Sequence, residues 1–80
     1  MSTITDQTLS QWKTGTAAQR IAADIASRIS GSAWERFEEL PPTEDTASQH
    51  DVSPRTASRA RKLLLDAGVL GRTGSVWFVA

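Results

Sequence analysis

Residues 52–70 of this chain read VSPRTASRARKLLLDAGVL, and the remaining elements can be worked out from this stretch. Ser53 is a favourable N-cap residue, and Pro54 suits the first helical position because it needs no hydrogen-bonded N–H there. At ~100° per residue, one face collects small or apolar side chains: Ala57, Ala60 and Leu64. Gly68 suits the left-handed residue that follows many helices. The stretch therefore predicts a helix over about residues 54–67 with one packing face.

The opposite face of this helix is basic. It carries Arg55, Arg59 and Lys62, with Thr56 and Ser58 beside them. An ordinary solvated face is one interpretation, because most charge runs on helices are of that kind. The segment that precedes the helix favours a face that reads DNA instead.

A shorter helix is predicted over residues 43–49. Thr43 can cap it, and Glu44 and Asp45 lie in its first turn, where acidic side chains interact favourably with the helix dipole. His50 and Asp51 leave room only for a tight turn before the next helix. The two helices therefore form a helix-turn-helix, whose second helix can enter the major groove of DNA.

Two short strands around a glycine-containing turn are predicted over residues 69–79. Such a hairpin, or wing, is too small to be stable alone, so Trp77 or Phe78 is expected to cover the core. Arg72 lies near its tip. This side chain either meets a phosphate or minor groove, or serves only to keep an edge strand soluble.

Upstream, apolar residues recur at helical spacing and the pattern ends at Gly31; they are Ala18, Ile21, Ala22, Ile25 and Ile29. This helix is expected to be core scaffolding, and Trp34 a lid on the core rather than a platform for bases. Residues 37–40 precede two prolines and are expected to pair with the wing. The predicted fold is mainly α with a small β-hairpin (α+β), a three-helix winged helix-turn-helix.

Length and composition limit the remaining possibilities. Eighty residues make one small domain, predicted over residues 16–80 after a flexible N-terminal segment at 1–15. The chain has no cysteine and no apolar run of membrane-spanning length, and its start lacks the features of a secretory signal, so a cytoplasmic location is expected. Its net charge is zero, but residues 1–50 carry −3 and residues 51–80 carry +3. Such a distribution would turn the basic part toward a phosphate backbone.

Catalysis finds little support in the sequence. His50 is the only histidine, and Glu38 and Glu39 are adjacent residues of an expected surface. No glycine-rich phosphate loop occurs, and no nucleophile has a base at a recognisable spacing. No enzyme activity, cofactor or metal is therefore expected.

The chain resembles the winged helix-turn-helix domain of the GntR family of bacterial transcriptional regulators over roughly residues 17–80. The family pattern has an isoleucine-rich first helix, a Leu-Pro pair before the second, Val-Ser before the recognition helix, a closing glycine and a wing that ends in Phe-Val. The matching residues are Ile21, Ile25, Ile29, Leu40, Pro41, Ala47, Val52, Ser53, Ala60, Leu64, Gly68, Gly74, Phe78 and Val79. All the spacings agree.

The departures from the family pattern concern both packing and base reading. Thr43 replaces a glutamate, Val76 replaces a wing glycine, and Thr46 and Arg61 occupy positions that are apolar in the family. The family often places arginines where this chain has Pro54 and Ser58, whereas Arg55 and Arg59 lie one residue further on. The resemblance therefore implies the same kind of regulator with a different preferred DNA sequence.

The leading hypothesis is a sequence-specific regulator that binds double-stranded DNA, in the manner of a bacterial repressor or activator. Helix 54–67 would lie in the major groove, and the wing on the adjacent backbone or minor groove. Arg55 and Arg59 would face base edges, Lys62 and Arg72 the backbone, and Ser53 and Thr56 phosphates or the helix start. The full set of expected DNA-binding residues is Thr43, Ser53, Arg55, Thr56, Ser58, Arg59, Lys62, Arg72, Thr73, Gly74 and Ser75.

Two alternatives stay open. One is a winged-helix module that binds a protein, through Arg61, Leu63 and Leu65 on the flanks of the third helix. The other is a small architectural or recombination factor, of the excisionase or plasmid-maintenance kind, that uses the same groove contacts. Family resemblance also implies an effector-binding and dimerising domain, which this chain lacks, and a homodimer on an inverted-repeat site. The chain is then either an isolated domain or a stand-alone regulator.

Overall fold

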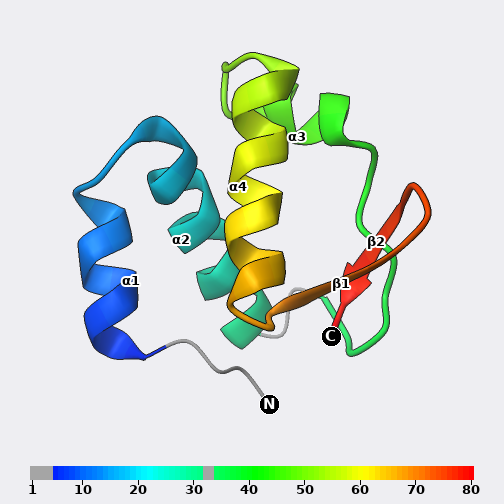
Figure 1. Ribbon diagram of the computed structural model, residues 1–80, viewed down its shortest axis with the longest axis horizontal. Helices are drawn as coiled ribbons and strands as arrows, with labels where there is room; N and C mark the ends of the chain where they lie inside the picture. The colour runs from blue at the N-terminus through cyan, green and yellow to red at the C-terminus, as the bar shows by residue number, and fades with distance from the viewer. Residues whose placement is uncertain (1–4, 32–33) are drawn as a thin grey trace.

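Three helices and a β-hairpin form the winged helix-turn-helix, and a fourth helix packs against them and contributes Trp12 to the core (Figure 1). The computed structural model describes residues 5–31 and 34–80. In chain order the elements are α1 (Asp6–Lys13), α2 (Ala17–Ser30), α3 (Thr43–Gln49), α4 (Pro54–Asp66), β1 (Leu70–Thr73) and β2 (Val76–Val79). The winged helix-turn-helix and the α+β fold class are confirmed.

Helix α2 is the central scaffold, as its apolar pattern predicts. It begins with a capping box, in which Thr16 and Gln19 satisfy each other's backbone N–H groups. Its buried residues Ile21, Ala22 and Ile25 share one core cluster with Ala60 and Leu64 of α4. These two residues and Ala57 form the buried stripe of α4, each 0% exposed. The small alanines let the two helices approach closely.

A tight corner joins α3 to α4, and both helices lie where the sequence predicts them. Asp51 adopts a left-handed φ of 54°, and the Val52 N–H donates to the Ala47 carbonyl at 3.0 Å. Ser53 caps α4 by accepting from the Thr56 N–H at 3.2 Å. After α4, Gly68 has a φ of 78°. Only a residue without a Cβ adopts that conformation at little cost.

Thr43 does not have the capping role expected of it. Pro42 occupies the N-cap position of α3, Thr43 is the first helical residue, and no side chain caps this helix. The predicted acidic residues Glu44 and Asp45 do lie in the first turn. The Thr43 hydroxyl is instead 3.4 Å from the guanidinium of Arg61.

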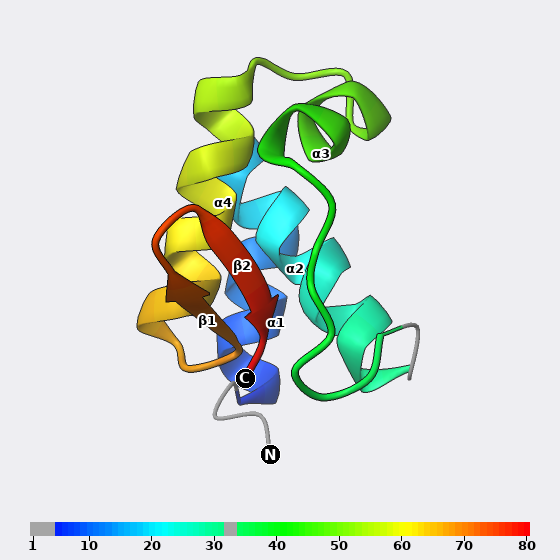
Figure 2. The same cartoon turned by 90° about the vertical axis from the view of Figure 1, so that its right-hand side faces the viewer.

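The wing is a two-stranded antiparallel sheet, with Leu70 opposite Val79 and Arg72 opposite Trp77. Trp77 and Val79 are buried in the core. The expected pairing of residues 37–40 with the wing is confirmed, although only one β-bridge forms, between Glu39 and Phe78. Figure 2 shows this segment along β2, on the side away from β1.

Residues 6–13 differ from the flexible segment expected at the start of the chain. They form α1, which lies against α2 on the side away from the wing (Figure 1). Trp12 is 8% exposed and belongs to the core, and Leu9 packs against the core. The buried Trp12 side chain anchors this helix to the core. Residues 1–4 of the expected flexible segment lie outside the described residues.

Trp34 is half-buried against the core, in agreement with its expected role as a lid. Within the described residues, no helix has the length and apolar character needed to cross a membrane. Within residues 5–31 and 34–80, there is no group of three or more histidine, cysteine or acidic residues that could hold a metal ion.

Candidate nucleic-acid interface

The exposed face of α4 presents the basic residues that the sequence places there. Arg55, Ser58, Arg59 and Lys62 are all exposed, on the side of the helix opposite its buried stripe. This arrangement follows from the helical spacing, because the residues that pack on α2 lie at Ala57, Ala60 and Leu64. The packing of one face thus fixes the direction of the other.

An open cleft of about 420 Å³ lies between this face and the wing. Four cationic side chains line it, namely Arg55, Arg59 and Lys62 from α4 and Arg72 from β1, together with Trp77 and Leu65. No acidic residue is among the lining residues. A cleft lined by charges of one sign concentrates the field and attracts a polyanion.

Arg72 is held in place by two contacts within the wing. Its Nε donates to the Gly74 carbonyl at 2.7 Å, and its guanidinium carbon lies 5.1 Å from the centre of the Trp77 ring. Arg72 and Trp77 are register partners, so both side chains lie on the same face of the hairpin. The Arg72 guanidinium is therefore directed before any ligand arrives.

Ser53 and Thr56 are engaged at the start of α4. The Ser53 Oγ accepts from the Thr56 N–H and lies 3.1 Å from the Thr56 Oγ1. These contacts support the helix-start role that was one of the two expected for this pair.

The other expected residues lie outside the cleft lining. Thr73, Gly74 and Ser75 form the exposed tip of the wing, and the Gly74 φ of 61° suits a residue without a side chain. Thr43 is half-buried at the start of α3. The structure therefore gathers four cations in one cleft and leaves the tip and the α3 start as separate flanking regions.

Arg61 is not on a flank of α4, as the interaction-module hypothesis requires. It is 1% exposed, and its Nη2 donates to the Pro41 carbonyl at 2.5 Å and to the Thr46 Oγ1 at 2.7 Å. Its spacing could have revealed this, because Arg61 follows Ala57 by four residues and precedes Leu64 by three, which places it on the buried stripe. The charge of Arg61 favours an exposed position, whereas its spacing places it on the buried face.

His50 ties the helix corner to α2. Its Nε2 lies 3.0 Å from the Asp24 carboxylate and its Nδ1 lies 3.0 Å from the Thr46 carbonyl. Asp24 also forms an ion pair with Arg28 at 3.2 Å. These contacts give the histidine a structural role, and it lies away from the cleft.

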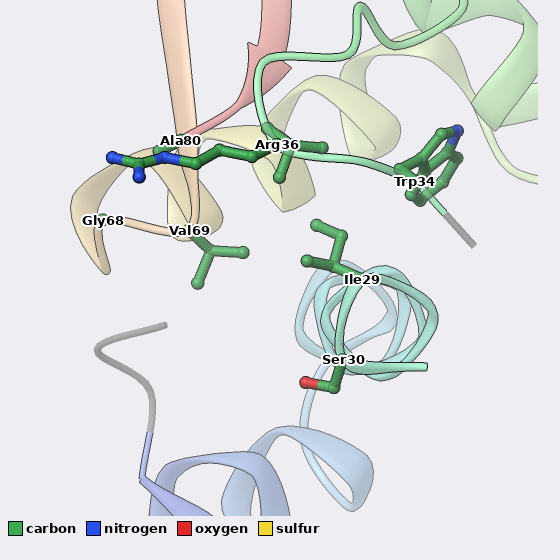
Figure 3. Close-up of a pocket in the computed structure, with 8 residues that line it drawn as sticks. Ile29, Ser30, Trp34, Arg36, Gly68, Val69 and Ala80 are labelled. Atoms are coloured by element: carbon green, nitrogen blue, oxygen red, sulfur yellow. The ribbon is translucent and has the colours of Figure 1, made fainter. Parts of the chain in front are cut away.

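A separate hollow, of about 240 Å³, lies at the C-terminal end of α2 (Figure 3). Its walls include Ile29, Trp34 and Val69, with Arg36 as a charged residue among them. It shares no lining residue with the basic cleft. Its small volume and largely apolar wall set it apart from the candidate interface.

No protein-family model matches this sequence, and no curated protein matches it significantly. Several solved structures, however, have the same fold. The N-terminal domain of AraR, crystallised with mutant ORR3, has a TM-score of 0.77 at 24% identity over 82% of this chain and 96% of that chain. YtrA from Sulfolobus acidocaldarius, a GntR-family transcription factor, has a TM-score of 0.70 at 24% identity over 84% of this chain and 70% of that one.

A third similar structure is the possible transcriptional regulator YydK from Bacillus subtilis. Its TM-score is 0.72 at 22% identity over 82% of this chain, but this chain spans only 30% of its length. At these identities the likeness concerns the fold. The chain therefore has the winged helix-turn-helix fold that is found in GntR-family transcription regulators, as its sequence pattern predicts.

Proposed function

We propose that this protein binds double-stranded DNA in a sequence-specific way and regulates transcription. The observation that carries the proposal is the cleft in which α4 and the wing direct four cations toward one space. In winged helix-turn-helix proteins the second helix of the motif can enter the major groove. In this arrangement α4 lies in the groove and the wing contacts the adjacent backbone or minor groove.

The proposed contacts divide between bases and phosphates. Arg55 and Arg59 are exposed on α4 and are assigned to base edges, where arginine can donate two hydrogen bonds to guanine. Lys62 and Arg72 are assigned to the phosphate backbone. Ser58 and the wing tip at residues 73–75 supply further polar contacts, as does Thr43 at the start of α3.

The charge distribution supports one orientation on DNA. Five of the seven charged residues after residue 50 are basic. Four of these five line the cleft, and the fifth, Arg61, is buried. The acidic excess lies in residues 1–50. A molecule with zero net charge can therefore present a positive face to DNA, although its non-specific affinity is expected to be modest.

The proposal also covers the location of the protein and its oligomeric state. A cytoplasmic protein that binds an inverted repeat as a homodimer fits a bacterial regulator of this fold. YydK and YtrA are longer than the region they share with this chain. An effector-binding domain joined to this fold is accordingly a further part of the proposal.

The alternative of a protein-interaction module is weaker than the sequence suggested, because Arg61 is buried and Leu63 and Leu65 are half-buried against the core. An architectural DNA factor would use the same cleft. Bending of the bound duplex separates the two DNA-binding functions, since an architectural factor deforms its site strongly.

Selection of bound duplexes from a random library, at about 100 mM salt, tests the proposal because weak non-specific contacts are largely screened there. We expect an enriched motif, and two half-sites about one helical turn apart if the protein binds as a dimer. A folded Arg55→Ala/Arg59→Ala variant is the control and should enrich nothing. Absence of enrichment with the wild-type protein, in a folded sample, would contradict sequence-specific DNA binding.

A further inference from the structure

Arg61 is a buried cation in the middle of the proposed recognition helix. At 1% exposure it cannot reach DNA directly. Its guanidinium donates from Nη2 to the Pro41 carbonyl, the Thr46 hydroxyl and, at 3.5 Å, the Pro42 carbonyl. Burial lowers its pKa, while Glu44 and Asp45 act in the opposite direction. An arginine in this setting stays protonated at neutral pH.

Thr46 and Arg61 are the two buried polar residues among those that the structure describes. Their side chains are hydrogen-bonded to each other at 2.7 Å. The resemblance noted above implies apolar residues at both positions. The contact between α3 and α4 is therefore a directional one in this chain.

The guanidinium joins three parts of the molecule. Arg61 belongs to α4, Thr43 and Thr46 belong to α3, and the Pro41 carbonyl belongs to the link before α3. That link is held to the wing, because the Leu40 N–H donates to the Trp77 carbonyl at 2.8 Å. Arg61 thus helps to hold α3 in place relative to α4 and the wing.

Thr43 is the partner through which this arrangement reaches the surface. The Arg61 Nη1 lies 3.4 Å from the Thr43 Oγ1, a longer bond than the one to Thr46. Arginine has donors only, so the Thr43 oxygen must accept, and its own O–H is directed elsewhere. Thr43 is half-buried, and within the described residues its hydroxyl makes this one hydrogen bond. This proton is available to an acceptor from outside, such as a phosphate oxygen.

We infer that Arg61 is a positioning residue for DNA binding: from beneath the interface it holds the start of α3 so that the Thr43 hydroxyl donates to a backbone phosphate. The inference rests on the proposed function, since it needs DNA to be the ligand. It adds a role for a residue that makes no contact with DNA. It also predicts that Arg61 and Thr43 act as a unit.

A double-mutant cycle on Kd, with the duplex selected above, tests this unit. The variants are Thr43→Val, which removes only the hydroxyl, Arg61→Met, and the two combined. We expect each single variant to bind about tenfold more weakly, and the double variant also about tenfold rather than hundredfold. Independent, multiplying losses would overturn the inference, as would an unchanged Kd in a folded Arg61→Met protein.

The salt dependence of Kd separates positioning from direct contact. Loss of a residue that itself neutralises a phosphate lowers the slope of log K against log salt by about one. Arg61→Met should leave that slope unchanged, whereas the matched control Arg72→Ala should lower it. A lower slope in a folded Arg61→Met protein would mean that Arg61 meets phosphate directly, which contradicts a positioning role.

If Arg61→Met does not fold, Thr46→Leu/Arg61→Leu replaces it in the cycle, because this pair restores the apolar contact of the family pattern. The same non-additivity with Thr43→Val is expected, and full additivity would overturn the inference. Failure of the proposed function looks different, because the wild-type protein itself would then select no duplex. Positioning by Arg61 fails when the wild type binds but the cycle shows no coupling, or when folded Arg61→Met has an unchanged Kd or a lower salt slope.

Discussion

Two arginines that are two residues apart on α4 have opposite environments. Arg59 is exposed and lines the cleft, whereas Arg61 is 1% exposed and contacts α3. Helical geometry explains the difference, because residues two positions apart do not share a face. The chemical identity of a side chain therefore says less about its role here than its angle around the helix.

Replacement of single cations on α4 should separate base reading from backbone attraction. Arg59→Ala is expected to lose roughly 1 to 3 kcal/mol of discrimination between the preferred site and its single-base variants. Lys62→Ala should weaken all sequences alike and lower the salt slope by about one. Titrations of matched duplexes at several salt concentrations measure both. Identical behaviour of the two variants and the wild type would mean that α4 is not the reading helix.

Roles that depend on local chain geometry could be predicted, and roles that depend on distant partners could not. The Ser53 cap and the buried stripe of α4 follow from spacing alone. Thr43 was expected to cap α3, but its hydroxyl meets Arg61, eighteen residues away. The contact of Arg72 with Trp77 likewise needs the register of the hairpin. Whether the expected DNA-binding residues contact DNA stays a prediction.

At the scale of elements, α4 and the wing have strong local signals, whereas α3 has no side-chain cap and α1 has a Thr5 cap but few apolar residues. Its sequence DQTLSQWK is mostly polar, and its order depends on Trp12 reaching the core. Local signals cannot reveal a contact that exists only after the chain has folded. Pairing of the segment at 37–40 could be predicted in part, because the prolines favour extended backbone at Leu40, but Phe37 lies in a turn with a φ of 67°.

The side-chain caps of α2 and α4 allow a paired test of Ser53. Ser53→Ala and Thr16→Ala each remove a capping hydroxyl and should lower the free energy of unfolding by about 1 kcal/mol. Ser53→Ala is expected to weaken DNA binding more than Thr16→Ala does, because Ser53 caps the proposed reading helix itself, whereas Thr16 lies beside Arg59 and Lys62 at the edge of the interface. Urea denaturation and Kd measurements on the same samples give both quantities. A similar loss of affinity in Thr16→Ala would show that reduced stability alone explains the effect.

The wing depends on a glycine at residue 71. A Cβ at this position would collide with the ring of its register partner, Phe78. Gly71→Ala should therefore cost about 1 to 3 kcal/mol of stability, as overpacking does. The penalty should shrink in a Phe78→Leu background, where the ring is absent. Thermal unfolding of the four proteins checks this, and an equal penalty in both backgrounds would argue against the collision.

At the scale of the whole molecule, α1 extends the core of the winged helix beyond the domain boundary expected at residue 16. Trp12 is buried with residues of α2, α4 and both strands in a single cluster. In a chain of 80 residues the net stability is small, so one large aromatic side chain is a sizeable part of it. We therefore expect α1 to unfold together with the rest of the protein.

Trp12→Ala tests this cooperativity. The change should lower the free energy of unfolding by about 3 to 5 kcal/mol, the usual range for a buried aromatic residue. Circular dichroism and the fluorescence of the remaining tryptophans should report one common transition. Unchanged stability would instead agree with a flexible segment at residues 1–15, and the exposed Lys13→Ala variant provides the control.

Because Trp77 lies beneath the Arg72 guanidinium, its intrinsic fluorescence can report on the cleft. Indole emission responds to a nearby cation and to water, and this indole lines the cleft that a duplex would fill. With Trp12 and Trp34 changed to phenylalanine, light emitted by the protein comes from that one ring. The wavelength and intensity of this emission then report in real time whether the cleft is occupied. The measurement needs no dye on the protein and no label on the nucleic acid.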